Sequence, residues 1–504
     1  MSLSNRAKEL SEPDPKFMFW DILQDLWHPE DNPGGFVSLG LAENSLMHDN
    51  LSAHIHEHMA LPNDALTYGD GKKRLRRSVA AFLTRHLAPA APVEPAHVTV
   101  ANGCSSAIEH AAWAFGDPGD SFLLGRPYYG TFVPDVTLRM GTKLIAVDFG
   151  GKDPLGLGAV RDYEDAILKA QRDGGRVAGL ILCHPHNPLG RCYPRPVLVE
   201  FMKLCQKYQV HLISDEIYAL STFTNTYDAS AEEASPFVSI LSIDPAGVID
   251  GGLVHAVWGV SKDFGANGLR LGALVSQHNP DLHAALVPVS LYSSSSAVTD
   301  HIVANFLDDR AWVERYISEN RRQLAANYEH VAAWANDNDV PYAPGVNAAF
   351  FLWVNLGAAW KKRHPGADDG GNRLRHGQTL KNATEVHRSP PLVVDDGAAL
   401  RAPQVPVVQH DHVIAATLGT PVVLAFIGDH VMRLCLHMKR GRLPSPSLLG
   451  LFRDQRKKLA TLLVAQRAKP GAALMAPAPM MAVTALLTAR PVRMLSKSIA
   501  LLLS

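Results

Sequence analysis

A lysine and an arginine eight residues apart, Lys262 and Arg270, have the clearest chemical potential in this chain. They lie in VWGVSKDFGANGLRLGAL, residues 257–274, where apolar residues typical of a strand end precede the lysine. The glycines that follow predict a turn that presents the amine to a cleft. A lysine amine whose pKa is lowered becomes a nucleophile that can hold an aldehyde as a Schiff base, and an arginine can grip a phosphate with a planar fork. Because a solvated surface lysine is the alternative, other parts of the chain must complete the site.

Strands and helices are predicted to alternate around these residues. The sequence predicts strands at 121–124, 177–183 and 210–214, and an amphipathic helix at 196–208. Such alternation is typical of an α/β fold in which helices cover both faces of a mainly parallel sheet. Ligands of such sheets bind at the carboxyl ends of the strands. We therefore expect the site at that edge.

Three more polar side chains, Asn187, Asp215 and Tyr218, follow predicted strands, as Lys262 does. A buried carboxylate is costly unless it meets a cation, and a protonated pyridine nitrogen is such a partner. Asp215 is therefore expected to pair with a cationic ligand group. The alternative is that it caps a helix.

The turn NGCSS is a candidate phosphate site. It lies between a predicted strand and a predicted helix, so free backbone N–H groups and the small Cys104 and Ser105 leave room for an anion. It is not a Walker loop, because GxxxxGK is absent, and an empty turn is the alternative. Tyr128 and Tyr129 follow the next strand, where a ring either fills the core or stacks on a flat ligand.

Candidates also lie near the N-terminus. Glu43, in GLAEN, either caps the next helix or faces a substrate, and Tyr68 is expected to be exposed on a turn. His54 and His58 share a helix face at a spacing of four residues. Without a third ligand, we interpret them as a surface pair and not as a metal site.

Composition limits the class of function. A formal net charge of -1 provides no basic field for nucleic acid, so we expect small molecules or copies of the chain itself as partners. The five cysteines are scattered without paired metal spacing, which favours a reducing compartment over a disulfide framework. The first residues lack the apolar core of a signal peptide, so a cytoplasmic protein is expected. No membrane span is expected, because the apolar stretch 471–487 is short and broken by proline.

Six motifs, in order along the chain, resemble the class I/II aminotransferases of pyridoxal phosphate fold type I. They are Tyr68-Gly69, NGCSS, PYY, NPLG, DEIY, and SKDFG with Arg270. GLAEN brings the resemblance closest to the 1-aminocyclopropane-1-carboxylate synthase-like branch, and ANGLRLG is similar to fungal members of secondary metabolism, some of which are C–S lyases. The resemblance covers about residues 17–356. It implies a large domain with a mainly parallel sheet and helices on both faces, and a smaller α+β domain.

The resemblance also implies pyridoxal 5′-phosphate as the cofactor and gives the matching residues their roles. Lys262 would hold the cofactor aldehyde and then move the Cα proton of the substrate. Asp215 would keep the pyridine nitrogen protonated. Asn187 and Tyr218 would hydrogen-bond the phenolic oxygen, and Tyr129 would stack on the ring.

The remaining roles concern the phosphate and the substrate. The residues implied to bind the phosphate are Cys104, Ser105, Ser261 and Arg270, with Tyr68 reaching it from the second subunit of a homodimer. Glu43 would face an amino-acid substrate. Gly259 stands where the family often has a serine, a loss of about 1 kcal/mol for one hydrogen bond. His184 stands where an asparagine is usual, which is expected to alter substrate contacts.

The C-terminal part departs from the family pattern. No Gly-Trp-Phe-Arg-like strand supplies an arginine for the substrate carboxylate, and Arg433 in VMRLCL is the nearest counterpart. We attribute residues 359–504 to a misread exon or frameshift and expect them to be poorly ordered. Alternatively the tail is genuine, and its basic segment 448–466 lies on a membrane or partner, or is a solvated helix face.

The predicted domains are an N-terminal segment of the small domain (1–49), a large cofactor-binding domain (50–295), the first part of the small C-terminal domain (296–358) and the atypical tail (359–504). Two hypotheses of different class follow. The first is an active enzyme at the Cα of an amino acid or a derivative. It would act by transamination in secondary-metabolite biosynthesis or, alternatively, by synthase-like or C–S lyase elimination. The second is an impaired relic that only binds the cofactor.

Overall fold

The computed structural model describes residues 3–11, 24–26, 31–32, 42–67, 72–228, 234–355, 358–359, 362 and 413–417. The chain divides into two compact units, one of residues 1–39, 368–390 and 423–504 and the other of residues 40–367 and 391–422. Within the described residues, the first unit contains helix α1 (Asn5–Ser11). The second contains the sheet and the other helices and strands.

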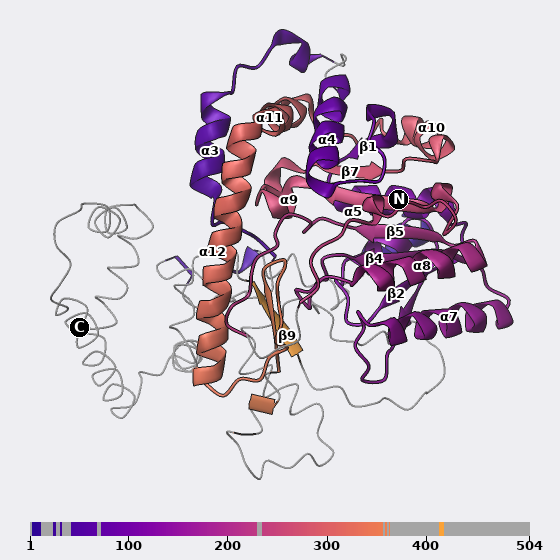
Figure 1. The fold of residues 1–504 in the computed structure, drawn as a ribbon. Coiled ribbons are helices and arrows are strands. Elements are labelled where there is room, and N and C mark those ends of the chain that lie inside the picture. Colours follow the sequence, from indigo (N-terminus) through magenta and orange to yellow (C-terminus); the bar gives the residue numbers. More distant parts are fainter. Residues whose placement is uncertain are drawn as a thin grey trace. The chain divides into compact units, whose positions relative to one another are not determined.

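A seven-stranded sheet forms the centre of the second unit, with the order β1-β7-β6-β5-β4-β2-β3 (Figure 1). β7 is antiparallel to both of its neighbours, and the other pairs are parallel. The strands are β1 (Val98–Ala101), β2 (Ser121–Gly125), β3 (Lys143–Val147), β4 (Val177–Cys183), β5 (His211–Asp215), β6 (Val254–Gly259) and β7 (Gly272–Val275).

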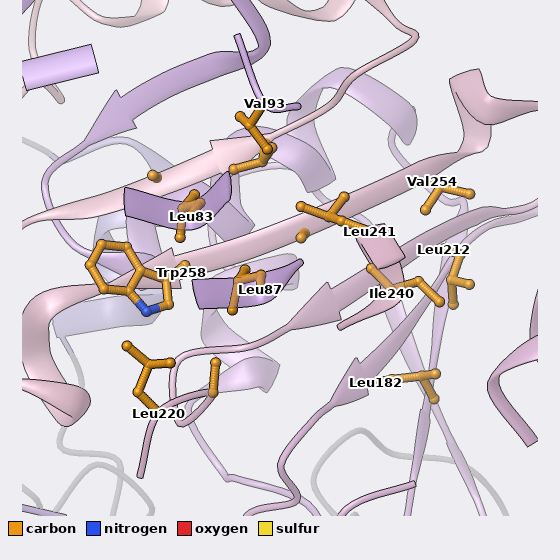
Figure 2. Close-up of a cluster of buried hydrophobic side chains, with 14 of the residues drawn as sticks. Leu83, Leu87, Val93, Leu182, Leu212, Leu220, Ile240, Leu241, Val254 and Trp258 are labelled. Atoms are coloured by element: carbon orange, nitrogen blue, oxygen red, sulfur yellow. The ribbon is translucent and has the colours of Figure 1, made fainter. Parts of the chain in front are cut away.

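Side chains of the central strands alternate between two buried layers. Leu180 and Leu182 of β4 face one layer, while Ile181 and Cys183 face the other. The first layer is closed by α4 (Lys72–Leu87), α7 (Leu157–Arg172) and α8 (Arg195–Tyr208), and the second by α5 (Cys104–Phe115) and α6 (Phe132–Thr137). Figure 2 shows part of the first layer, where Leu83 and Leu87 of α4 lie near Trp258. Because both faces are covered, β4 is apolar throughout, as parallel strands usually are.

The remaining helices connect and cover the sheet. The α-helices are α3 (His48–Glu57), α9 (Val260–Asp263), α10 (Pro280–Val289), α11 (Ala297–Asp308) and α12 (Arg310–Asp337). The 3-10 helices are η2 (Asn63–Leu66), η3 (Pro95–His97), η4 (Ile240–Ser242), η5 (Gly251–Leu253) and η6 (Asn267–Leu269). In the described part of the chain, no helix is both long and apolar enough to cross a bilayer.

A second, smaller sheet pairs β8 (Phe351–Asn355) with β9 (Val413–Thr417) in antiparallel register. β9 lies inside the segment that the sequence predicted to be atypical, so β8 gains a partner from the tail. Arg433 and the basic segment 448–466 lie outside the described residues. The three predicted domain boundaries stay predictions.

Two local predictions were wrong in detail. Lys262 lies in the single-turn helix α9 and not in an open turn. The sequence also predicts a helix from Trp312 to Trp334, and α12 begins two residues earlier, at Arg310, because the Asp309 side chain accepts the Trp312 N–H and caps it. Of the other predicted elements, β4 has the predicted bounds, and β2, α8 and β5 differ by one residue at one or both ends, where backbone hydrogen bonds and not side-chain pattern set the boundary.

We expect Leu180→Ala to lower the free energy of unfolding by about 2–5 kcal/mol, because it leaves a cavity in the fully buried β4. Leu157→Ala on α7 is the matched control, since that leucine is 58% exposed. Its effect should stay within about 0.5 kcal/mol. Urea denaturation followed by circular dichroism measures both, and equal losses in the two variants would contradict the described core.

Candidate active site

The predicted site residues gather at one edge of the sheet. β4, β5 and β6 are parallel, and their ends are in register, with Cys183 opposite Asp215 and Asp215 opposite Val257. Gly259, at the end of β6, lies opposite Gly272, at the start of the antiparallel β7. Asn187, Asp215, Lys262 and Arg270 lie at or next to these strand ends, and therefore at the same edge of the sheet.

Lys262 is half-buried in α9, where its Nζ donates a hydrogen bond of 2.6 Å to the carbonyl oxygen of Ala42. Burial lowers the pKa of the amine to about 8, although the nearby Glu43 carboxylate acts in the opposite direction. The amine is thus much less basic than an exposed lysine, whose pKa is about 10.4. About a tenth of the amine is neutral at pH 7, far more than for an exposed lysine, which gives it the nucleophilic and basic character that the sequence suggested.

Asp215 is 5% exposed at the end of β5, and its Oδ1 accepts the backbone N–H of Ile217 at 3.3 Å. Burial raises the pKa of its carboxyl group to about 7, and the Asp135 carboxylate adds to the rise. Its neighbour Glu216 also has a pKa raised to about 7 by burial, but Glu216 accepts three donors, at 2.6 Å, 2.7 Å and 3.0 Å. The two carboxyl groups differ in the number of hydrogen bonds that they accept. Glu216 is a satisfied structural carboxylate, while Asp215 can still gain from a cation.

Asn187 and Tyr218 lie close to Asp215. Tyr218 is 2% exposed and meets Phe350 and Phe351 edge-on, with ring centroids 5.3 Å and 5.4 Å away. The Asn187 side chain lies close enough to Tyr218 to act on its hydroxyl group, but the Asn187 Oδ1 is buried without a partner. A buried polar atom left unsatisfied is unusual, so this amide is poised for a ligand group. Rotation of the amide would present its NH₂ group instead, because the oxygen and nitrogen are assigned by their contacts.

The predicted phosphate turn lies at the N-terminus of α5. Gly103 has a φ of 88°, which favours glycine, and a Cβ there would lie 2.4 Å from Nη2 of Arg270. The guanidinium of Arg270 therefore lies against the first turn of α5, while its Nη1 donates to the carbonyl oxygen of Asn267 at 3.0 Å. Free helical N–H groups and an exposed arginine at one point make an anion site.

The departure at Gly259 has a steric explanation. A Cβ at Gly259 would lie 2.6 Å from the Leu271 carbonyl oxygen and 2.8 Å from Sγ of Cys104. A serine does not fit there, because the sulfur and the neighbouring strand occupy the space. Burial raises the pKa of the Cys104 thiol well above its usual value, so the sulfur is a neutral packing group beside the anion site.

The other predicted residues have less uniform surroundings. Ser261 is buried, Ser105 and Glu43 are exposed, and Tyr129 is half-buried with its ring 5.7 Å from that of Phe132 in an edge contact. Tyr68 and Arg433 lie outside the described residues.

His184 lies behind the site within the core. Its Nδ1 accepts the Tyr193 N–H at 3.2 Å and its Nε2 donates to the Val238 carbonyl oxygen at 2.9 Å. Burial lowers its pKa to about 4, so the ring is neutral. Both ring nitrogens are occupied by the backbone, and His184 therefore serves the loop and not a substrate.

Sequence reasoning missed two carboxylates. Asp263 accepts hydrogen bonds from the Leu220 N–H, the Ser221 hydroxyl at 2.8 Å and the Trp258 indole at 3.0 Å, and so fixes the turn of Lys262. Asp135 on α6 lies close to Ser105, and burial raises the pKa of its carboxyl group to about 7. The position of Asp263 directly after the lysine was a usable signal, whereas nothing in the sequence marked Asp135.

Comparison with known proteins identifies the family. The model of aminotransferase class I and II matches residues 38–408. The chain belongs to this family. The resemblance drawn from the motifs is confirmed, and so is the predicted fold type. A structure of Thermus thermophilus aspartate aminotransferase with maleate has the same fold, with a TM-score of 0.60, 16% identity and coverage of 87% of this chain and 98% of that one.

Two relatives in sequence belong to the predicted branch. A Mus musculus protein named "Probable inactive 1-aminocyclopropane-1-carboxylate synthase-like protein 2" is 33% identical over 344 residues, which are 66% of this chain and 57% of the mouse protein. An Oryza sativa subsp. japonica protein named 1-aminocyclopropane-1-carboxylate synthase 5 is 30% identical over 396 residues, 75% of this chain and 71% of the rice protein. The chain thus spans little more than half of the mouse relative.

We expect acylation of Lys262 by a small active ester to rise with pH and to reach half its maximum near pH 8, where half of the amines are neutral. Exposed lysines should reach that point about two pH units higher, because their pKa is about 10.4. Glu43→Gln should move the Lys262 midpoint to lower pH, since the lost negative charge no longer favours the ammonium form. Peptide mass spectrometry gives each profile. A Lys262 midpoint equal to that of the exposed lysines would refute the desolvated amine.

Proposed function

We propose that this chain is a pyridoxal 5′-phosphate-dependent enzyme that acts at the Cα of an amino acid or an amino-acid-derived intermediate, by transamination. One observation carries the proposal: three groups lie at the same edge of the sheet. They are the Lys262 amine with a pKa of about 8, the buried Asp215 carboxyl group with few hydrogen-bond donors, and the N-terminus of α5 with Arg270 against it. The amine suits an aldehyde, the carboxylate suits a pyridinium, and the helix N-terminus suits a phosphate.

The residues present fit this cofactor. The open amide of Asn187 is an orphaned polar group in the place where the resemblance puts the phenolic oxygen. Gly272 lets the start of β7 lie directly against the first turn of α5, since a Cβ at Gly272 would lie 2.5 Å from the Cys104 backbone nitrogen. We infer that Arg270, Ser105 and Ser261 hold the phosphate, with the Cys104 N–H.

The remaining cofactor contacts follow the same assignment. Asp215 would hold the pyridine nitrogen, Tyr218 the phenolic oxygen, and Tyr129 would stack on the ring. When bound, the cofactor supplies a ring that withdraws electrons and stabilises negative charge at the substrate Cα.

Lys262 would move the proton at the Cα. Its pKa of about 8 lies near working pH, which suits both proton removal and return. The Ala42 carbonyl oxygen orients the amine, and Asp263 fixes the backbone of its turn through the donors from Leu220 and Ser221. The exposed carboxylate of Glu43, close enough to raise the pKa of Lys262, is placed to meet the amino group of a substrate.

Elimination at the β or γ carbon is the second candidate, because the same proton transfer begins both reactions and two of the relatives carry synthase names. A cofactor-binding relic is the third candidate. The name of the mouse relative favours it, while the presence of both Lys262 and Asp215 argues for activity. Arg433 remains our candidate for the substrate carboxylate, and we place the enzyme in secondary-metabolite biosynthesis.

A homodimer in the cytoplasm completes the proposal. Val287, Leu291 and Tyr292, in and after α10, are 68%, 84% and 75% exposed, which is a large apolar surface for a single copy to leave in water. A second copy would cover such a surface, and Tyr68 would then reach the phosphate of the other subunit. Residues 1–49 and 296–358 are proposed to form the small domain.

We expect purified protein with added pyridoxal 5′-phosphate to absorb visible light and to carry the cofactor on the Lys262 peptide after borohydride reduction. Lys262→Ala should remove both signals and lower activity at least about 100-fold, because the positioned base is lost. Lys203→Ala is the control, since that side chain is 56% exposed and paired with Glu200 on the surface. Labelling of another lysine, or an unchanged band in Lys262→Ala, would sink the proposed function.

We expect keto acid to form over many turnovers only when a 2-oxo acid acceptor is supplied, because without an acceptor for the amino group the reaction stops after one equivalent per site. Ammonia or thiol released without an acceptor would assign elimination instead. A cofactor band that does not change with any of the common amino acids, with no product formed, would favour the relic. Coupled assays for keto acid, ammonia and free thiol on one preparation distinguish the three.

A further inference from the structure

A cluster of three potential metal ligands lies away from the candidate active site. His54 lies on α3, His58 directly follows that helix, and Asp309 directly precedes α12; these two segments, distant in sequence, lie side by side (Figure 1). Their ligand atoms lie within 4.8 Å of one another, and no other such group of three occurs among the residues that the structure describes. The sequence offered no third ligand for the histidine pair, because Asp309 is 255 residues from His54.

His58 already has the hydrogen bond that a ligating histidine needs. Its Nδ1 lies 2.9 Å from the carbonyl oxygen of His54. A carbonyl oxygen only accepts, so Nδ1 carries the proton and Nε2 keeps its lone pair. Hydrogen bonds of this kind from the second ring nitrogen typically fix the tautomer and orientation of metal-binding histidines.

Asp309 is held in the same manner. Its Oδ1 accepts the Trp312 N–H at 3.0 Å as the cap of α12, and its Oδ2 lies 3.3 Å from Nε2 of His54. One oxygen therefore fixes the side chain while the other faces the histidines. Because a carboxylate oxygen accepts, Nε2 of His54 carries the proton in this contact, and a metal ion bound between the two atoms would take the place of that proton.

Packing limits the motion of His54 but leaves the cluster open on one side. The His54 ring is buried between His58 and Trp312, with centroids 4.1 Å and 4.4 Å away. Burial lowers the pKa of His54, which favours the neutral ring that a metal requires. His58 is exposed, and the Asp309 side chain is 38% exposed, so an ion and a water ligand have access from solvent.

We propose that His54, His58 and Asp309 bind a divalent transition metal, with Zn²⁺ as the expected ion, and that the ion links α3 to the start of α12. Two imidazoles and one carboxylate with a water form a common zinc set, whereas Mg²⁺ and Ca²⁺ prefer sites made of oxygen ligands. Ligands bound to zinc at about 2.0–2.1 Å lie closer together than the present spread, so His58, at the exposed end of α3, must move inward.

The ion would act on the segment that reaches the active site. The chain runs from Ala42, whose carbonyl oxygen holds Lys262, directly into α3. A link from α3 to α12 restrains that segment from its C-terminal end. The proposal itself depends on the three ligands alone, and not on the proposed enzyme activity.

Isothermal titration of the full chain with ZnCl₂, and visible absorption after titration with CoCl₂, test the site. We expect the wild type to show one tight zinc event that His58→Ala and Asp309→Asn each weaken at least about tenfold. His56→Ala is the matched control, because His56 is exposed on the same helix and lies outside the cluster. Asn also caps helices, so Asp309→Asn keeps the start of α12 while removing the charge.

Zinc should also raise the melting temperature of the wild type and of His56→Ala by a few degrees, since a ligand bound only to the folded state stabilises it. His58→Ala should lose this rise while keeping its melting temperature in zinc-free buffer. The same zinc affinity and cobalt spectrum in all four proteins would overturn the proposal, because the chain has 23 histidines that can bind zinc elsewhere. Absence of a tight event in the wild type would overturn it as well.

Discussion

Desolvation of Lys262 and Asp215 at the edge of the sheet is the interaction on which the candidate site depends. Burial shifts both groups toward their neutral forms, with pKa values of about 8 for the amine and about 7 for the carboxyl. A buried ionisable group in this state is stabilised when a partner of opposite charge binds beside it. The sheet edge thus prepares an amine to react and a carboxylate to bind a cation, before any ligand is present.

Keeping these two groups buried requires a rigid frame around them. Asp263 fixes the turn of α9 with donors from Leu220, Ser221 and Trp258, and the Phe264 ring next to it packs against Tyr316 with centroids 5.2 Å apart. The Tyr316 hydroxyl donates to the carbonyl oxygen of Phe264 at 2.8 Å. Helix α12, whose cap is Asp309, therefore packs against the turn that carries Lys262.

The N-terminal segment connects the two sites. Ala42 receives the Lys262 amine, and the helix that begins six residues later brings His54 to Asp309. Both contacts fasten the same stretch of chain to the core, one through a backbone oxygen and one through side chains. An ion bound at the contact between His54 and Asp309 would therefore act on Lys262 through this segment.

The sequence by itself determined the alternation of strands and helices, the edge of the sheet at which the candidate site lies, and the order of the motifs. Hydrophobic periodicity and glycine placement are local signals, and the match of Val177–Cys183 to a strand shows how strong they are when both faces are buried. Asn187, Asp215 and Lys262 could be found for the same reason, since each directly follows a strand. Tertiary structure alone decided what meets across the chain: Ala42 with Lys262, Cys104 in the space of a serine at Gly259, Asp135 with Ser105, and Asp309 with His54. Such contacts arise from packing between segments far apart in sequence, so no local pattern encodes them, and the desolvation that sets each pKa exists only once those segments have closed together.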